Sequence, residues 1–168
     1  MKIFLPLLLL FSLSISSQTK TENIEPIIEV SAYKNFEVFD ASIPSDVKTY
    51  QKLGLDEKCP NLLDPTIAKD EIKEIGKAWM DLNQKIGNFL TKNNFHWESD
   101  ASAIKVWHKF YFHKDGTLNK YFFNFITNIS QEKKNEYKKL IEEFAKNYKL
   151  PLTKESQFAQ CGKAAFNN

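Results

Sequence analysis

Apolar residues between Thr66 and Lys92 recur with the period of an α-helix. Successive members are three or four positions apart, and they are Ile72, Ile75, Trp79, Leu82, Ile86 and Phe89. This spacing places them on one face of an amphipathic helix. Asp64 or Thr66 is positioned to cap the start of the helix, and Asn93 and Asn94 mark its end.

The next two apolar segments have the composition of β-strands. Ile104–His113 and Leu118–Thr127 are rich in aromatic and β-branched residues, and Asp115-Gly116 lies between them. Two such strands joined by Asp-Gly predict a β-hairpin. The register stays open, because a two-residue turn at Asp115-Gly116 and a three-residue loop with Gly116 as a bulge bring opposite faces of the strands together.

A second helix and a last strand complete the pattern. Ser130 is positioned to cap a helix that Leu150-Pro151 ends, and its apolar face consists of Tyr137, Leu140, Ile141, Phe144, Ala145 and Tyr148. Gln157–Phe166 is expected to be the last strand. The order of helix, hairpin, helix and strand predicts an α+β fold, a two-layer domain over residues 65–168.

The part of the chain before this domain has no clear period. We expect residues 18–64 to form an irregular N-terminal extension of loops and short strands. Ile27–Val30 and Phe36–Ile43 are the two candidate strands. Pro44, Gly54 and Pro60 indicate loop after them, with one helical turn.

Residues 1–17 have the three parts of a cleavable secretory signal peptide. Lys2 supplies a positive charge, Ile3–Leu13 is almost wholly apolar, and Ser14–Ser17 is rich in small residues. The apolar run is about a dozen residues long, against the roughly 20 that a membrane-spanning helix needs. We therefore expect an exported protein, periplasmic or extracellular, with no transmembrane span once the signal is removed.

Composition narrows the class of protein. The aromatic content of 14%, with 14 Phe, is enough to build a hydrophobic core, so we expect a folded domain. The formal net charge is only +2, and all 23 basic residues are Lys. Nucleic-acid binders usually carry a clear basic surplus and use Arg on guanine and phosphate. We therefore expect no nucleic-acid partner.

The two cysteines are the candidates for a covalent cross-link. An even pair of cysteines in an exported protein favours a disulfide, here Cys59–Cys161. The alternative is two free thiols. A bond would attach the segment from Lys58 to Leu62 to the strand around Ala159 to Lys163.

No group of residues has the spacing of a catalytic or metal site. His108 and His113 are five positions apart, so in one strand they point to opposite faces and do not share a metal. His96, Glu98 and Asp100 offer ligand atoms without a diagnostic spacing. We expect no catalytic residue, no metal and no cofactor.

The aromatic residues of the hairpin are the candidate binding residues. A two-layer domain buries one face of its sheet, so some of these rings should remain on the other face. Either the N-terminal segment covers them, or they form a partner surface or a ligand groove. The predicted binding residues are Trp107, Tyr111, Tyr121 and Phe123.

The stretch from Asp70 to Phe166 resembles the C-terminal domain of TonB-type energy transducers. The resemblance lies in the element order and in a phenylalanine-rich strand that ends in an Asp-Gly turn, Phe112-His113-Lys114-Asp115-Gly116-Thr117-Leu118. It implies a periplasmic module that pairs its edge strand with a partner, and it carries over no catalytic residue. Unlike that family, the chain is expected to have no uncleaved membrane anchor and no Pro-rich spacer. The Lys- and Asn-rich composition is also similar to that of small exported proteins of Bacteroidetes-type bacteria.

These observations favour an exported, non-catalytic binding module of the cell envelope or periplasm that uses its aromatic-rich sheet or a sheet edge. An envelope protein is the expected partner. The alternative is a small-ligand carrier or an enzyme with a pocket between sheet and helices, lined by His96, Glu98 or Asp100. A purely structural envelope protein is the third hypothesis.

Export predicts removal of the signal peptide. N-terminal sequencing of the exported protein should find a chain that starts after Ser16 or Ser17, because the small residues of that segment fit a signal peptidase. A mature chain that still begins with Met1 would contradict this.

Overall fold

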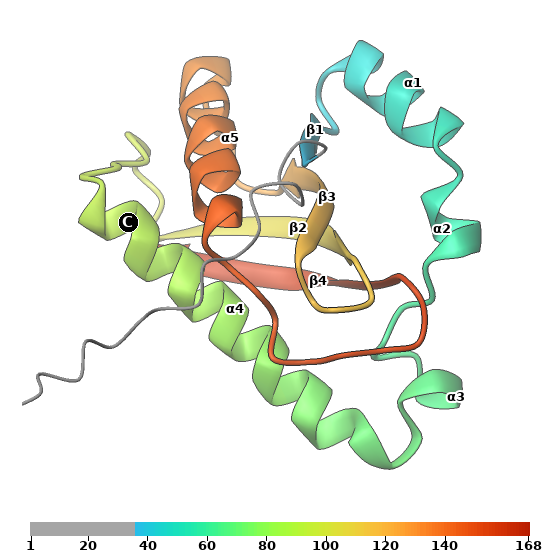
Figure 1. Cartoon of the computed structure of the whole chain (residues 1–168). Coiled ribbons are helices and arrows are strands. Elements are labelled where there is room, and N and C mark those ends of the chain that lie inside the picture. Colours follow the sequence, from blue (N-terminus) through green and yellow to red (C-terminus); the bar gives the residue numbers. More distant parts are fainter. Residues whose placement is uncertain (1–35) are drawn as a thin grey trace, which may run out of the picture.

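The structure is a computed structural model that describes residues 36–168, and Figure 1 shows its path. The predicted signal peptide at 1–17 and the candidate strand Ile27–Val30 lie outside the described residues. The elements run in the order β1 (Glu37–Asp40), α1 (Pro44–Lys52), α2 (Leu55–Lys58), α3 (Pro65–Ala68), the 3₁₀ turn η2 (Lys69–Glu71), α4 (Ile72–Lys92), β2 (Ala103–Phe112), β3 (Leu118–Phe125), α5 (Gln131–Lys146) and β4 (Phe158–Asn167). The predicted α+β class is confirmed.

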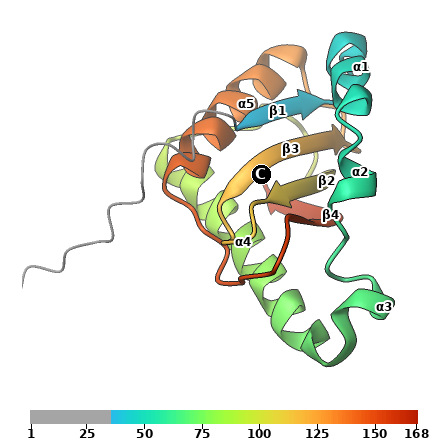
Figure 2. The same cartoon turned by 45° about the vertical axis from the view of Figure 1, so that its right-hand side comes forward.

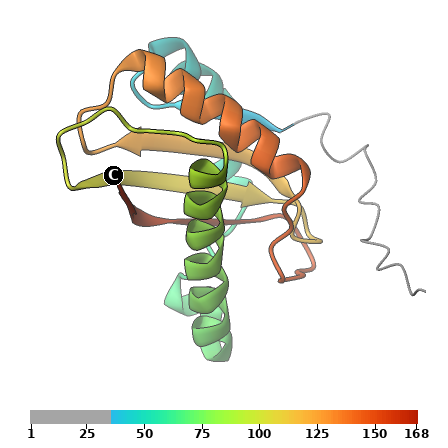
Figure 3. The ribbon, with the colours of Figure 1, turned by 90° about the vertical axis from the view of Figure 1, so that its left-hand side faces the viewer.

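The four described strands form one mixed sheet in the order β1-β3-β2-β4. β1 runs parallel to β3, whereas β3 and β4 both pair antiparallel with β2. Helices α4 and α5 lie across one face of this sheet, and Figure 3 shows them in front of it with α1 behind. Figure 2 shows α1 and α2 following each other along the other side. The two hairpin strands, β2 and β3, are thus the central strands of the sheet, with helices on both of its faces.

The segment before residue 65 belongs to the same sheet-and-helix unit. The predicted strand at Phe36–Ile43 is present as β1, which pairs with β3 through Val38↔Tyr121. The loop expected after it contains two helices, α1 and α2. Pro44 opens α1 at a position where its missing N–H costs nothing. α1 has only Val47 and Tyr50 as large apolar positions and α2 is a single turn, so neither is long enough to show a helical period in the sequence.

The tip of the hairpin settles its register. The N–H of His113 donates to the carbonyl of Thr117 at 2.9 Å, and the N–H of Gly116 donates back to the carbonyl of His113 at 2.9 Å. The connection is thus the three-residue loop, with Gly116 as the bulge at φ 91°. Asp115 completes the turn, because its Oδ1 accepts from the N–H of Thr117 at 3.1 Å and from its hydroxyl at 2.7 Å.

This register turns the even-numbered residues of β2 toward the helices. These side chains are all 0% exposed, and they are Ile104, Val106, His108, Phe110 and Phe112. A second irregularity follows the turn: Tyr111 faces Lys120 but Phe112 faces Leu118, so Asn119 is an extra residue on β3. The extra residue allows both Leu118 and Tyr121 to join the main core.

Helix α4 buries a face close to the predicted one. Its buried residues are Ile75, Ala78, Leu82, Ile86 and Leu90. Ile72 is 45% exposed, because it opens the helix in the part that Figure 3 shows running past β4. Asp64 caps the separate turn α3 and not α4, since its Oδ1 accepts from the N–H of Thr66 at 2.8 Å. Ser130 caps α5 as predicted, accepting from the N–H of Lys133 at 3.2 Å.

Replacing Gly116 should strongly destabilise the protein. A Cβ at this position would lie 2.3 Å from the carbonyl oxygen of Leu150 and 2.8 Å from that of Leu152, and the backbone is left-handed. We expect Gly116→Ala to lower the free energy of unfolding by at least about 2 kcal/mol. Urea denaturation of the purified protein measures this.

The matched control is Gly76→Ala. A Cβ there meets nothing within 4 Å, and the residue is inside α4. This change should raise the free energy of unfolding by about 0.5–1 kcal/mol, because alanine is the better helix former. Equal stability of Gly116→Ala and the wild type would refute the described turn.

Candidate functional site

The four predicted binding residues lie on two opposite faces of the sheet. Tyr121 and Phe123 point toward α5 and are 0% exposed, so the surface of the sheet does not present them to a partner. Tyr111 points the other way but is also 0% exposed, because α1 and α2 cover it. Trp107 is only partly buried and is the one of the four that reaches solvent.

Helices α1 and α2 cover one end of the face that carries Trp107. Tyr50 stacks on Phe122 with 4.2 Å between ring centroids, and Cys59 packs in the small cluster that holds Tyr111. The N-terminal segment thus covers part of the aromatic face, one of the two outcomes expected from the sequence. At the other end the side chains are exposed, among them Lys105, Asn124, Lys163 and Ala165.

Strand register identifies the neighbours of Trp107 on this face. Asn124 of β3 and Lys163 of β4 lie directly across from it. Lys105 and Lys109 lie two positions away along β2, on the same face. Cross-strand neighbours are about 5 Å apart at Cβ. We call these five residues the Trp107 face: one indole surrounded by an amide and three ammonium groups.

One of the three lysines is neutralised. The ammonium of Lys109 lies 2.6 Å from Oδ1 of Asp56 and 5.2 Å from the centre of the Tyr111 ring. Lys105 and Lys163 have no ion-pair partner within residues 36–168. The exposed end of the sheet therefore carries uncompensated positive charge at two positions next to the indole, one along β2 and one across on β4.

Asp56 also binds two tyrosines. Its Oδ1 accepts a short hydrogen bond from Tyr111 and a 3.2 Å hydrogen bond from Tyr50, and the two phenol oxygens contact each other. Burial alone would raise the pKa of Asp56, but the hydrogen bonds from Lys109 and Tyr111 outweigh it and lower that pKa. Burial raises the pKa of Tyr50 to about 12. These phenols stay protonated and fasten α2 to the sheet.

His108 lies behind Trp107, inside the core. Its Nδ1 is 3.0 Å from the hydroxyl of Tyr121, which is 2.7 Å from that of Tyr137, and all three side chains are 0% exposed. Burial lowers the pKa of His108 to about 3, so the ring is neutral. The indole ring of Trp79 packs edge-on against it at 5.0 Å. This chain of hydrogen bonds therefore lies in the core, away from solvent.

The residues of the alternative pocket are not between sheet and helices. His96, Glu98 and Asp100 are exposed in the connection from α4 to β2, and Glu98 pairs with Lys133 at 2.9 Å. A hollow of about 590 Å³ lies instead at the hairpin tip, lined by His113, Lys114, Asp115, Thr117, Ser156 and Gln157. Across residues 36–168, no three His, Cys, Asp or Glu side chains are grouped to hold a metal ion. No helix of that part is long and apolar enough to cross a bilayer.

The predicted Cys59–Cys161 disulfide is wrong, since both thiols are free. The expected packing of the two segments is nevertheless present, because Asn61 pairs in parallel with Ala159. That register sets Cys59 level with Gln157, four residues from Cys161, which is roughly 13 Å along a strand and too far for a bond. Cys161 instead accepts a 3.3 Å hydrogen bond from the amide of Asn61.

The thiols should differ in reactivity in the native protein. Cys59 is 1% exposed and burial raises the pKa of its thiol, whereas Cys161 is only half-buried. We expect Ellman's reagent to modify Cys161 first and Cys59 only on unfolding, with two thiols in total without reductant. Cys59→Ser should remove only the thiol that reacts after unfolding and leave the reaction of Cys161 in the native protein unchanged. A total of zero thiols would contradict the structure.

No protein-family model, no curated protein and no solved structure matches this chain. The resemblance to TonB-type C-terminal domains stays a prediction.

Proposed function

We propose that this protein is an exported, non-catalytic binding protein of the cell envelope, and that the Trp107 face is its binding surface. The observation that carries the proposal is the partly exposed indole of Trp107 beside Lys105 and Lys163, two lysines with no ion pair in the described chain. Export is supported by the signal-peptide pattern at residues 1–17.

The indole of Trp107 lies outside the main hydrophobic core. The core on the other face already contains Phe110, Phe112 and Phe123, each fully buried. A partly exposed tryptophan at the centre of a surface is typical of binding hot spots, because it offers a large rigid apolar area at low entropic cost. Its neighbours are polar, so the surface fits a ligand that needs one stacking contact inside a hydrogen-bonding rim.

The charges of the face also favour binding. Lys105 and Lys163 flank Trp107 without a carboxylate to offset their repulsion, and an anionic ligand would relieve it. The nearby proton-transfer groups have other contacts: Asp56 holds Lys109 and two phenols, and His108 is inside the core. This arrangement supports binding more than catalysis.

A second candidate is a small-ligand carrier, and the hollow at the hairpin tip favours it. Its volume of about 590 Å³ is within the usual range for ligand sites. His113 and Gln157 are the lining residues whose removal would alter it most directly without touching the Trp107 face.

Binding to isolated cell envelopes of the producing organism tests the proposal. Trp107→Ala should weaken co-sedimentation at least about tenfold, because a central aromatic contact is lost. Met80→Ala is the matched control, since Met80 is 67% exposed on α4, on the other side of the sheet. Circular dichroism and urea midpoints check that both variants stay folded.

Two results would decide against the proposal. One is unchanged envelope binding by folded Trp107→Ala. The other is loss of binding only in His113→Ala or Gln157→Ala, which would favour the carrier.

A further inference from the structure

We infer that the ligand of the Trp107 face is an acidic polysaccharide, with one sugar ring stacked on Trp107 and carboxylates paired with Lys105 and Lys163. This inference rests on the proposed function and adds the chemical class of the ligand. It depends on four features of the face: its polar neighbours, its open shape, its unpaired charge and its single accessible ring.

The polar neighbours distinguish a sugar from a protein partner. A protein interface buries a contiguous apolar core around its hot spots. All four nearest neighbours of Trp107 on this face are Lys or Asn. The one described aromatic in contact with the indole is Phe122, at 6.1 Å edge-on, and Tyr50 already stacks on Phe122. The apolar side chains near the indole are thus the half-buried Phe122 and the exposed Ile126, whose N–H donates to the carbonyl of Lys105. These two are too few for the contiguous apolar core of a protein interface, whereas a sugar presents C–H groups to the ring and hydroxyls to the rim.

The shape of the surface favours a polymer over a small molecule. Small-molecule sites are concave and enclose most of the ligand. The Trp107 face is the surface of a sheet, and the exposed positions continue beside it at Ala165, which pairs with Lys105. Ala165 is small, so it leaves room next to the indole for a chain to pass. Affinity on such a surface comes from several weak sites along one polymer.

The positive charge of the Trp107 face favours a negatively charged ligand. Lys109 is compensated by Asp56, so this pair is neutral as a unit. Lys105 and Lys163 remain, one along the strand from Trp107 and one across from it, about 5–7 Å away at Cβ. Lysine is a point charge that suits single carboxylates, and the chain has no Arg for a bidentate contact. Carboxylates spaced along a sugar chain can reach both ammonium groups beside one stacked ring.

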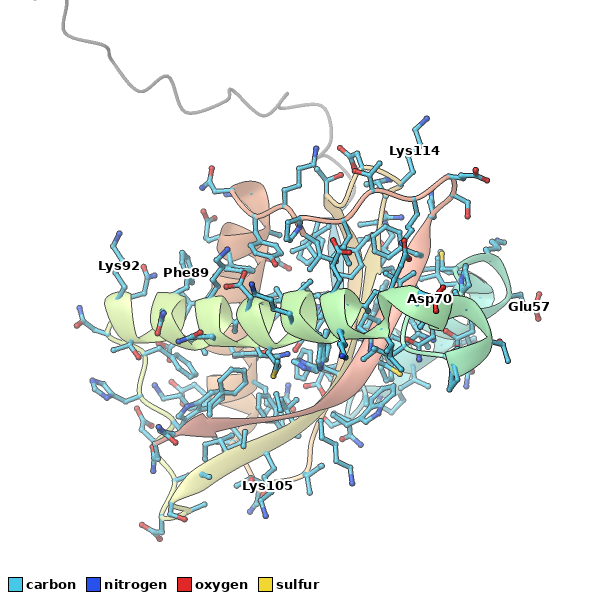
Figure 4. The ribbon with its side chains drawn as sticks, turned by 90° about the horizontal axis from the view of Figure 1, so that it is seen from below. Glu57, Asp70, Phe89, Lys92, Lys105 and Lys114 are labelled. Carbon is cyan, nitrogen blue, oxygen red and sulfur yellow. The ribbon has the colours of Figure 1, made fainter. Side chains whose placement is uncertain are left out.

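The side chains on the two sides of the sheet supply a matched control. Figure 4 shows Lys105 on the side of the strands away from α4, and Lys92 at the far end of α4. Lys92 is exposed and has no ion pair in the described chain. Lys92→Gln therefore removes the same charge as Lys105→Gln without altering the Trp107 face.

The experiment compares three soluble polymers by affinity electrophoresis and isothermal calorimetry. Polygalacturonate supplies sugar and charge, dextran supplies sugar alone, and poly-glutamate supplies charge alone. We expect the wild type to bind polygalacturonate at least about tenfold more tightly than either of the others. The affinity should fall between about 50 and about 300 mM salt, because the lysine contacts are screened.

Variants separate stacking from charge. Trp107→Ala should lose polygalacturonate binding with every lysine still present, and Lys105→Gln and Lys163→Gln should each weaken it several-fold at low salt. Lys92→Gln should bind like the wild type. Quenching of tryptophan fluorescence by polygalacturonate should vanish in Trp107→Phe, because Trp97 is only 4% exposed and Trp79 is on the α4 side.

Each contrary result overturns the inference in a distinct way. Equal binding of poly-glutamate and polygalacturonate would point to an acidic polypeptide. An equal effect of Lys92→Gln and Lys163→Gln would show attraction by net charge only. If polygalacturonate does not bind while envelope binding still requires Trp107, the ligand class is wrong and the proposed function stands. If neither requires Trp107, both fail.

Discussion

The pairing register of β2 with β3 is the constraint on which the rest of the structure depends. Side chains alternate between the two faces of a strand, so one register places Phe110 and Phe112 under the helices and the register shifted by one residue would place Lys109 and Tyr111 there. Burying an unpaired lysine is far more costly than burying phenylalanine. The loop at Lys114–Gly116 fixes the choice, because Gly116 adopts a backbone that other residues resist and lies against the carbonyl of Leu150.

Once that register is set, small residues on β4 allow α4 to approach the sheet. A Cβ on Gly162 would lie 3.1 Å from the indole nitrogen of Trp79, so the absence of a side chain there lets the helix pack closely. The edge of β4 is partly closed by the chain before α3. Gln160 extends this closure with its side chain, which accepts from the N–H of Leu63 at 3.0 Å and donates to the carbonyl of Cys161 at 2.8 Å. Pairing ends there, and the remainder of the strand has no neighbour on its outer side among the described residues.

The face of the sheet away from α4 and α5 is partly covered by α1 and α2, which polar contacts hold in place. Asp56 receives Lys109 and two tyrosine hydroxyls, and this cluster holds α1 and α2 over the Tyr111 end of the sheet. α1 and α2 extend only over that end of the sheet, so they leave Trp107 partly exposed. The proposed binding surface is therefore the part of the sheet that neither helical layer reaches. Its chemistry follows from which residues the strand pattern turned outward, an indole with one free lysine along β2 and another across on β4.

The sequence by itself determined the local elements, because their signals are carried by residues close together in the chain. The spacing of Leu82 and Ile86, the cap at Ser130 and the Asp-Gly turn each act over a few residues, and α4, α5 and the hairpin formed where these signals indicated. Only the tertiary structure decided which aromatic rings were accessible. Trp107 and Phe123 have the same local strand signal, and they differ solely in which face of the strand meets the helices. The same holds for the cysteines. Their segments do pack together, but the register of Asn61 against Ala159 sets the sulfurs apart, and that register depends on contacts between residues almost a hundred positions apart in the chain.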